Sequence, residues 1–199
     1  MTSSIRLAAA VFLVATAFSH AAACHAADGD AAAGKRKTVT CNACHGQSGF
    51  KSMPKLGGQG AIYLVAALRA YKEDKRAHAT MRDVAHALSE KDIADLAAHY
   101  AAVPIAVGDG IAPSDVVVGR SAIVERCAAC HGALGAQPSA PEVALIAGQN
   151  PGYLDQALRE YKSGARSHAL MQEQARDLDD QQIAEVVAWF ARQKGLSVK

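Results

Sequence analysis

Two short motifs in the chain combine cysteine pairs with a histidine, residue types that bind metals and attach cofactors. They are Cys41-Asn42-Ala43-Cys44-His45 and Cys127-Ala128-Ala129-Cys130-His131. Cys-x-x-Cys-His is the attachment signature of c-type haem. Two cysteines at this spacing, at the end of a helix, reach both vinyl groups on one haem edge, and the histidine that follows lies under the iron. The motifs therefore predict two covalently attached haem c groups, held by Cys41, Cys44, Cys127 and Cys130, with His45 and His131 as iron ligands.

Other uses of paired cysteines are weighed against haem attachment. A zinc site would gather four thiolates in one place, whereas the two pairs lie 86 residues apart. A thioredoxin-like pair would need a βαβ context, which the sequence does not indicate. Two structural disulfides would leave the histidines that follow without a role. Haem attachment is the hypothesis that accounts for all six residues.

The second axial ligand of each iron decides what a haem protein does. An open iron face allows oxygen or peroxide chemistry, whereas a filled face favours electron transfer. Met81 and Met171 follow the two motif histidines by 36 and 40 residues, at equivalent places, and Met53 has no counterpart. Methionine also commonly fills protein cores. The recurrence nevertheless favours ligation, so we predict Met81 as a ligand of the first iron and Met171 of the second.

Two histidines offer an alternative to the methionines. His78 and His168 each stand three residues before a methionine, and as ligands they would give a bis-histidine centre of lower potential. We expect them instead to be loop histidines that contact solvent or a propionate. Arg76 and Arg166 could pair with propionates, although a solvated surface accounts for them nearly as well.

An internal repeat organises the elements around these residues. The second copy has four additional residues between its motif histidine and its Gly-Gln pair, and such an insertion is best tolerated in a loop. Apolar positions at helical spacing and helix-start signals such as Ser89, Asn150-Pro151 and Asp179 indicate helices throughout. One of these helices is expected to begin near Asp30 and run into Cys41. The recurring features are Gly58-Gln59 with Gly148-Gln149, Tyr63 with Tyr153, Arg76 with Arg166, and Tyr100 with Phe190.

The predicted fold class is all-α, a tandem pair of small helical domains that each surround one haem. We expect a first domain over residues 28–103, a linker over 104–113 that contains two prolines and two glycines, and a second domain over 114–199. Half of the residues are hydrophobic but only 5% are aromatic. Domains of this size with an alanine-rich core are hard to stabilise alone, and two haems would fill the interior.

The net charge excludes one class of protein, and the N-terminus predicts where in the cell this protein lies. The formal net charge of +2, without a basic cluster, excludes a typical nucleic-acid-binding protein. Residues 1–27 resemble a signal peptide, with Arg6 before an apolar run from Leu7 to Phe18. We expect export to a periplasm and no transmembrane segment in the mature chain, with peripheral membrane association left open. Cys24 either leaves with the signal peptide or serves as a lipoprotein cysteine.

With these features the chain resembles the cytochrome c4 family of two-haem class I cytochromes. The resemblance covers the mature chain and is carried by the two attachment motifs, the two methionines, and the stretches Leu56-Gly57-Gly58-Gln59 and Ile146-Ala147-Gly148-Gln149. It implies two cytochrome c folds with their haems near one another. In such folds a proline before the Gly-Gln pair accepts a hydrogen bond from the proximal histidine. Pro54 matches that position in the first copy, but Ala144 stands there in the second, so the orientation of His131 is left open.

The resemblance implies an electron carrier rather than an enzyme. Its redox partners would be a quinol-oxidising complex or a dehydrogenase on one side and a terminal oxidase or reductase on the other. Two alternatives stay open. The chain could be the haem subunit of a dehydrogenase, such as a sulfide-oxidising flavocytochrome, or a haem peroxidase in which one methionine does not ligate.

Overall fold

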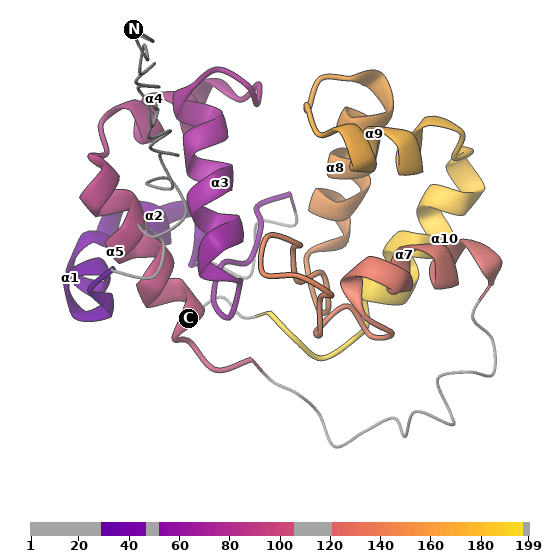
Figure 1. Cartoon of the computed structure of the whole chain (residues 1–199), viewed down its shortest axis with the longest axis horizontal. Helices are drawn as coiled ribbons and strands as arrows, with labels where there is room; N and C mark the ends of the chain where they lie inside the picture. The colour runs from indigo at the N-terminus through magenta and orange to yellow at the C-terminus, as the bar shows by residue number, and fades with distance from the viewer. Residues whose placement is uncertain (1–28, 47–51, 106–120, 197–199) are drawn as a thin grey trace, which may run out of the picture.

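The computed structural model describes residues 29–46, 52–105 and 121–196. They form two helical domains that lie side by side (Figure 1). We call residues 29–46 and 52–105 the N-terminal domain and residues 121–196 the C-terminal domain. The predicted signal peptide, Cys24 and most of the predicted linker lie outside the described residues, so the predicted domain boundaries stay predictions.

From the helix that carries the motif onward, the described helices occur in the same order in both domains. No strand occurs in the described ranges, where a single isolated β-bridge joins Arg76 to Arg166, and the predicted all-α class is confirmed. Nowhere in these ranges does a helix have the length and apolar character needed to cross a membrane. The N-terminal domain contains α1 (Ala31–Lys37), α2 (Val39–His45), α3 (Ala61–Lys72), α4 (Ala79–His86) and α5 (Glu90–Ala101), and the C-terminal domain contains α7 (Ala122–His131), α8 (Pro151–Ser163), α9 (Ala169–Arg176) and α10 (Asp180–Ala191).

Capping residues explain where the longer helices begin. Ser89 and Asp179 form capping boxes with Asp92 and Gln182, as their spacing predicts. Pro151 occupies the first position of α8, where its missing N–H costs nothing. The helix starts that the sequence indicates are therefore confirmed for α5, α8 and α10.

The approach to the first motif differs from its prediction. A single helix was expected to run from Asp30 into Cys41, but the chain forms two helices that meet at Thr38. The Thr38 hydroxyl donates to the carbonyl oxygen of Lys35 at 2.9 Å, which closes α1. The Thr38 carbonyl then accepts from the Asn42 N–H at 2.7 Å and begins the bonding of α2. A threonine side chain that competes for helix carbonyls in this way interrupts a helix.

Each domain packs its terminal helix on the helix that follows the Gly-Gln pair. In the N-terminal domain, α5 buries Ile93, Leu96 and Tyr100 against α3. In the C-terminal domain, α10 packs on α8 and on α7. The larger C-terminal core comprises Val124, Leu154, Ala175, Leu178, Ile183, Val186, Val187, Trp189 and Phe190.

The four additional residues of the second copy lie in a loop, as predicted. This loop turns at Gly135, whose φ of +79° suits glycine. A Cβ at this position would lie 2.8 Å from the Phe190 ring. The Gly135 carbonyl accepts from the N–H groups of Ile146 and Ala147 at 2.8 and 3.1 Å. The loop is thereby fastened to the core beside the second motif.

Candidate haem-attachment sites

Both motifs lie at the C-terminal ends of their helices. α2 ends at His45 and α7 ends at His131. In each motif the first cysteine is partly buried and the second is exposed, and none of the four forms a disulfide. Burial raises the pKa of Cys41 and of Cys127.

The structure places the two cysteine pairs in different domains. Cys41 and Cys44 belong to α2, whereas Cys127 and Cys130 belong to α7. Among the described residues, no three histidine, cysteine or acidic side chains gather to hold one metal ion. A structural zinc site would require the four thiols to lie together at one ion. The structure instead places them in two separate pairs.

The two motif histidines are held by backbone carbonyl groups. The Nδ1 atom of His45 lies 2.8 Å from the carbonyl oxygen of Pro54, and that of His131 lies 2.8 Å from the carbonyl oxygen of Ala144. A carbonyl oxygen only accepts, so each Nδ1 carries the proton and each Nε2 is left as the electron-pair donor. Burial lowers the pKa of both imidazoles, against the opposing effect of these hydrogen bonds. Neutral rings with this tautomer are suited to bind a metal.

The equivalence of Pro54 and Ala144 answers the question that the sequence left open. The acceptor is the main-chain carbonyl, which alanine supplies as well as proline does. Both distances are 2.8 Å. His131 is therefore oriented like His45 without a proline.

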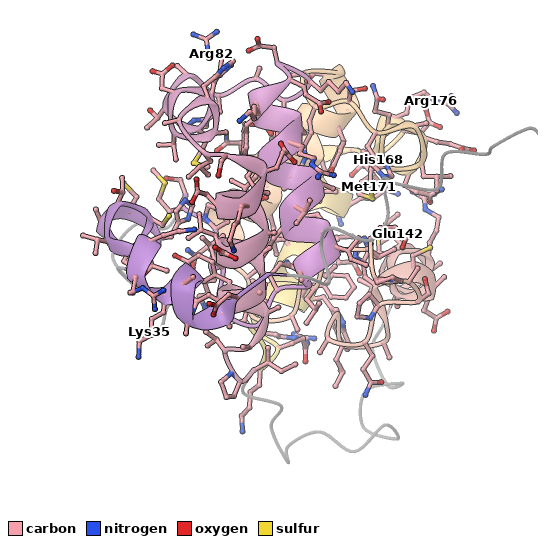
Figure 2. The ribbon with its side chains drawn as sticks, turned by 60° about the vertical axis from the view of Figure 1, so that its left-hand side comes forward. Lys35, Arg82, Glu142, His168, Met171 and Arg176 are labelled. Carbon is pink, nitrogen blue, oxygen red and sulfur yellow. The ribbon has the colours of Figure 1, made fainter. Side chains whose placement is uncertain are left out.

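Met81 and Met171 lie in the first turns of the short helices α4 and α9. His78 and His168 are the N-caps of these helices, and their Nδ1 atoms accept from the N–H groups of Met81 and Met171 at 3.2 and 3.3 Å. Figure 2 shows His168 beside Met171. These histidines were expected in loops near solvent or a propionate. The structure shows that they cap helices instead. The three-residue spacing from each histidine to its methionine could have indicated this role.

The first cysteine of each motif packs against the core of its domain. Cys41 packs against the N-terminal core, as do Leu56, Leu68 and Leu88. Cys127 packs against the C-terminal core, as do Leu134, Ile146, Leu158 and Tyr161. An apolar core, next to thiols and a histidine with a free Nε2, fits the apolar ring and the metal of a covalently bound haem.

A polar cluster lies between the domains and contains matched residues from each. The Arg76 guanidinium donates to the Tyr153 hydroxyl at 3.0 Å, and that of Arg166 donates to the Tyr63 hydroxyl at 2.9 Å. Both arginines are buried, and no carboxylate in the described part of the chain forms an ion pair with either. Burial alone would raise the pKa of Tyr153, but the charges of Arg166 and Arg76 outweigh it and lower this pKa to about 8. The cluster is therefore a buried site of positive charge.

Comparisons with known proteins agree with this geometry. The cytochrome c family model matches residues 117–194. Cytochrome c4 of Pseudomonas aeruginosa is 32% identical over 180 residues, which cover 83% of this chain and 89% of that protein. A protein of Thiomonas intermedia named thiosulfate dehydrogenase electron acceptor is 28% identical over 181 residues, with 81% and 82% of the two chains covered.

A solved structure supports the same assignment. The crystal structure of reduced recombinant cytochrome c4 from Pseudomonas stutzeri superposes with a TM-score of 0.69 at 25% identity, covering 85% of this chain and 100% of that chain. The sequence relatives and this structure span both domains, and each chain is covered over most of its length. The chain therefore belongs to the cytochrome c4 family of electron-transfer proteins with covalently bound haem c.

Proposed function

We propose that each domain holds one haem c, attached through Cys41 and Cys44 in the N-terminal domain and through Cys127 and Cys130 in the C-terminal domain. His45 and Met81 are the iron ligands of the first haem, and His131 and Met171 are those of the second. Haem iron supplies reversible one-electron chemistry when bound. The protein then carries single electrons and makes or breaks no bond in a substrate.

The observation that carries this proposal is the duplicated histidine geometry. In both domains the imidazole is neutral and anchored at Nδ1 by a carbonyl 2.8 Å away, with Nε2 free. In both domains a methionine stands in the first turn of the helix that follows α3 or α8. A haem iron bound by both a histidine and a methionine would have no open position, which favours electron transfer over catalysis.

The interface cluster is suited to the acidic edge of a haem. Arg76 and Arg166 are buried and have phenolic rather than carboxylate partners. Buried charges are normally compensated. We assign these arginines to the propionates, which would provide that compensation.

In the cell we place the protein in the periplasm, exported by residues 1–27. There it takes electrons from a quinol-oxidising complex or a dehydrogenase and passes them to a terminal oxidase or reductase. The relative named thiosulfate dehydrogenase electron acceptor favours a dehydrogenase as donor. Stopped-flow reduction by purified thiosulfate dehydrogenase, compared with reduction by a purified quinol-oxidising complex, distinguishes the two donors.

The ligand assignment is tested by optical spectroscopy of the purified protein. We expect a far-red methionine–iron band from both ferric haems and little binding of carbon monoxide to the reduced protein. Met81→Ala and Met171→Ala should each remove one of the two bands, lower one reduction potential, and open one iron to carbon monoxide. A variant with an unchanged spectrum would refute the methionine assignment in that domain. Ready carbon monoxide binding by the wild type would favour the peroxidase alternative.

A further inference from the structure

The Gly-Gln pair recurs in both halves of the sequence, and the proposed function gives its glutamines no role. Gln59 and Gln149 are 4% and 3% exposed. A buried amide side chain requires hydrogen-bond partners. The principal partners of each glutamine lie in the other domain.

Gln149 of the C-terminal domain binds the backbone of Lys55 in the N-terminal domain. Its Oε1 atom accepts from the Lys55 N–H at 2.8 Å, and its Nε2 atom donates to the Lys55 carbonyl oxygen at 3.0 Å. The two bonds fix which end of the amide is oxygen. Gln149 Oε1 also accepts from the N–H of Asn150 at 2.8 Å, which anchors the side chain to the start of α8.

Gln59 of the N-terminal domain makes the reciprocal contacts. Its Oε1 atom accepts from the Leu145 N–H at 2.8 Å, and its Nε2 atom donates to the Leu145 carbonyl oxygen at 2.9 Å. Its Oε1 atom also accepts from the N–H of Gly60 at 3.0 Å. Each glutamine thus makes the same three bonds, two of which cross the interface.

The backbone groups that these glutamines bind are part of the histidine anchors. The Lys55 N–H and the Pro54 carbonyl belong to one peptide group, and that carbonyl accepts from His45. In the other domain, the Leu145 N–H and the Ala144 carbonyl belong to one peptide group, and that carbonyl accepts from His131. A single amide therefore connects each glutamine to the proximal histidine of the opposite domain.

We propose that Gln149 and Gln59 are positioning residues that act in trans, each setting the strength of the hydrogen bond on the proximal histidine of the other domain. An amide whose N–H donates becomes a better acceptor at its carbonyl, and this cooperativity is strongest away from water. A stronger bond at Nδ1 makes the imidazole a more basic ligand. The inference rests on the proposed assignment of His45 and His131 as iron ligands.

The test uses two near-isosteric variants, Gln149→Met and Gln59→Met, in the full-length holoprotein. We measure both reduction potentials by spectroelectrochemistry and assign each to its haem with the Met81→Ala and Met171→Ala variants. We also record the Nδ1–H resonances of His45 and His131 in the reduced protein by nitrogen-edited NMR. Should a methionine variant not fold, Gln149→Asn or Gln59→Asn withdraws the same contacts and keeps a polar side chain.

The expected result is crossed between the domains. Gln149→Met should raise the potential of the first haem, with a change of about threefold in its ferric-to-ferrous ratio at fixed potential. This ratio corresponds to about 28 mV for a one-electron couple. The His45 Nδ1–H resonance should move upfield and exchange faster with solvent, while His131 is unchanged. Gln59→Met should produce the same changes at the second haem and in the His131 resonance, and should leave His45 unchanged.

Tyr153→Phe and Tyr63→Phe are the matched controls. Each removes a hydrogen bond across the same interface but leaves both glutamines in place. If these variants shift the same Nδ1–H resonances as the glutamine variants, general loosening of the interface explains the effect and the proposal is wrong. The proposal would also be wrong if each glutamine variant shifted the potential and the histidine resonance of its own domain, or shifted neither potential and neither resonance.

The wild-type spectrum separates this inference from the proposed function. Ring protons of a histidine that ligates a reduced haem are displaced far upfield by the haem ring current. Without such signals from His45 and His131, the ligand assignment itself is wrong. With them, an absence of crossed shifts contradicts the trans effect alone.

Discussion

The N-terminal and C-terminal domains share one helical plan but secure their terminal helices by different means. α5 is tied to α1 by a buried carboxylate, whereas α10 is held by large apolar side chains. The histidine anchors nevertheless have the same 2.8 Å distance in both. The histidine anchors therefore have the same length whether the terminal helix carries a buried ion pair, as α5 does, or buries Phe190 and Trp189, as α10 does.

The carboxylate of the N-terminal domain is that of Asp95, whose side chain is 0% exposed. It accepts from the Asp30 N–H at 2.8 Å and forms ion pairs with Lys37 at 2.6 Å and Lys91 at 3.0 Å. The equivalent residue of the second repeat, Glu185, is exposed. A buried charge is tolerated here because several partners satisfy it.

The C-terminal domain has aromatic side chains on the corresponding helix. Phe190 is fully buried and Trp189 is 7% exposed. Tyr100 takes the place of Phe190 in the N-terminal domain, and its hydroxyl donates to the Asn42 side chain at 3.0 Å. Ala128 occupies the position of Asn42 in the second motif, so a hydroxyl group there would have no such acceptor.

The largest effect should come from Phe190→Ala. Loss of a fully buried phenyl ring leaves a cavity and should lower the free energy of unfolding of the C-terminal domain by about 3–5 kcal/mol. Trp189, the one tryptophan in the chain, reports this transition by fluorescence during urea unfolding. Hydrogen exchange in α5 serves as the control. Equal loss of protection in both domains would mean that they unfold as one unit, and α5 and α10 would then not be stabilised independently.

The second largest effect should be a difference between the domains in their stability to acid. Hydrogen bonds from Lys37 and Ser89 lower the pKa of Asp92 to about 2, and those from Lys37 and the Asp30 N–H hold the pKa of Asp95 well below its usual range. A lowered folded-state pKa contributes stability above the unfolded value of about 3.9, which is lost as the pH falls through the folded value. We expect α1 and α5 to lose exchange protection between about pH 4 and pH 2.

Asp95→Asn tests whether the Asp95 carboxylate causes the response to acid. The variant should destabilise α1 and α5 at neutral pH, because Lys37 and Lys91 lose a charged partner, and should weaken the dependence on acid. α10 lacks a buried carboxylate at this position and serves as the internal reference. An acid response of α10 as large as that of α5 would contradict the ionic account.

An exchange of the aromatic residues has a smaller expected effect. Phe190→Tyr should cost about 1–3 kcal/mol, since the new buried hydroxyl lacks an acceptor. Adding Ala128→Asn should recover part of this loss by supplying the amide oxygen that Asn42 provides in the N-terminal domain. Urea unfolding of the two single variants and the double variant forms a double-mutant cycle. Strictly additive effects would show that the pair is not transferable between domains.

The smallest expected effect is that of Tyr100→Phe. It removes one hydrogen bond to Asn42 and should cost about 0.5–1.5 kcal/mol in the N-terminal domain. Hydrogen exchange in α5 measures the loss, and Asn42→Ala is the matched partner variant. If the two single losses do not overlap in the double variant, the hydrogen bond is not the source of the effect.

The sequence predicted the helices best where capping chemistry is local. Ser89, Asp179 and Asn150-Pro151 each mark a helix start with neighbouring residues alone. Thr38 was missed because its hydroxyl ends α1 within a stretch that is helical on both sides. The capping role of His78 and His168 was also missed, since histidine is an uncommon N-cap.

The site was predictable to the extent that it depends on spacing. Spacing nominated the motif residues and the two methionines, whose roles as ligands stay predictions. It could not indicate that Ala144 anchors a histidine as Pro54 does, because a main-chain carbonyl has no signature in side-chain identity. It also gave Gln59 and Gln149 no role, since their partners lie in the other domain about 90 residues away.

The reciprocal contacts between the domains also bear on how such a chain could arise. Surfaces that contact each other in this mutual way are those that two identical chains form about a two-fold axis. One ancestral domain with a glutamine, an arginine and a tyrosine at these positions would already pair with a copy of itself. Fusion of two copies makes that pairing independent of protein concentration without adding a contact. The halves are then free to diverge, one towards Asp95 and the other towards Trp189.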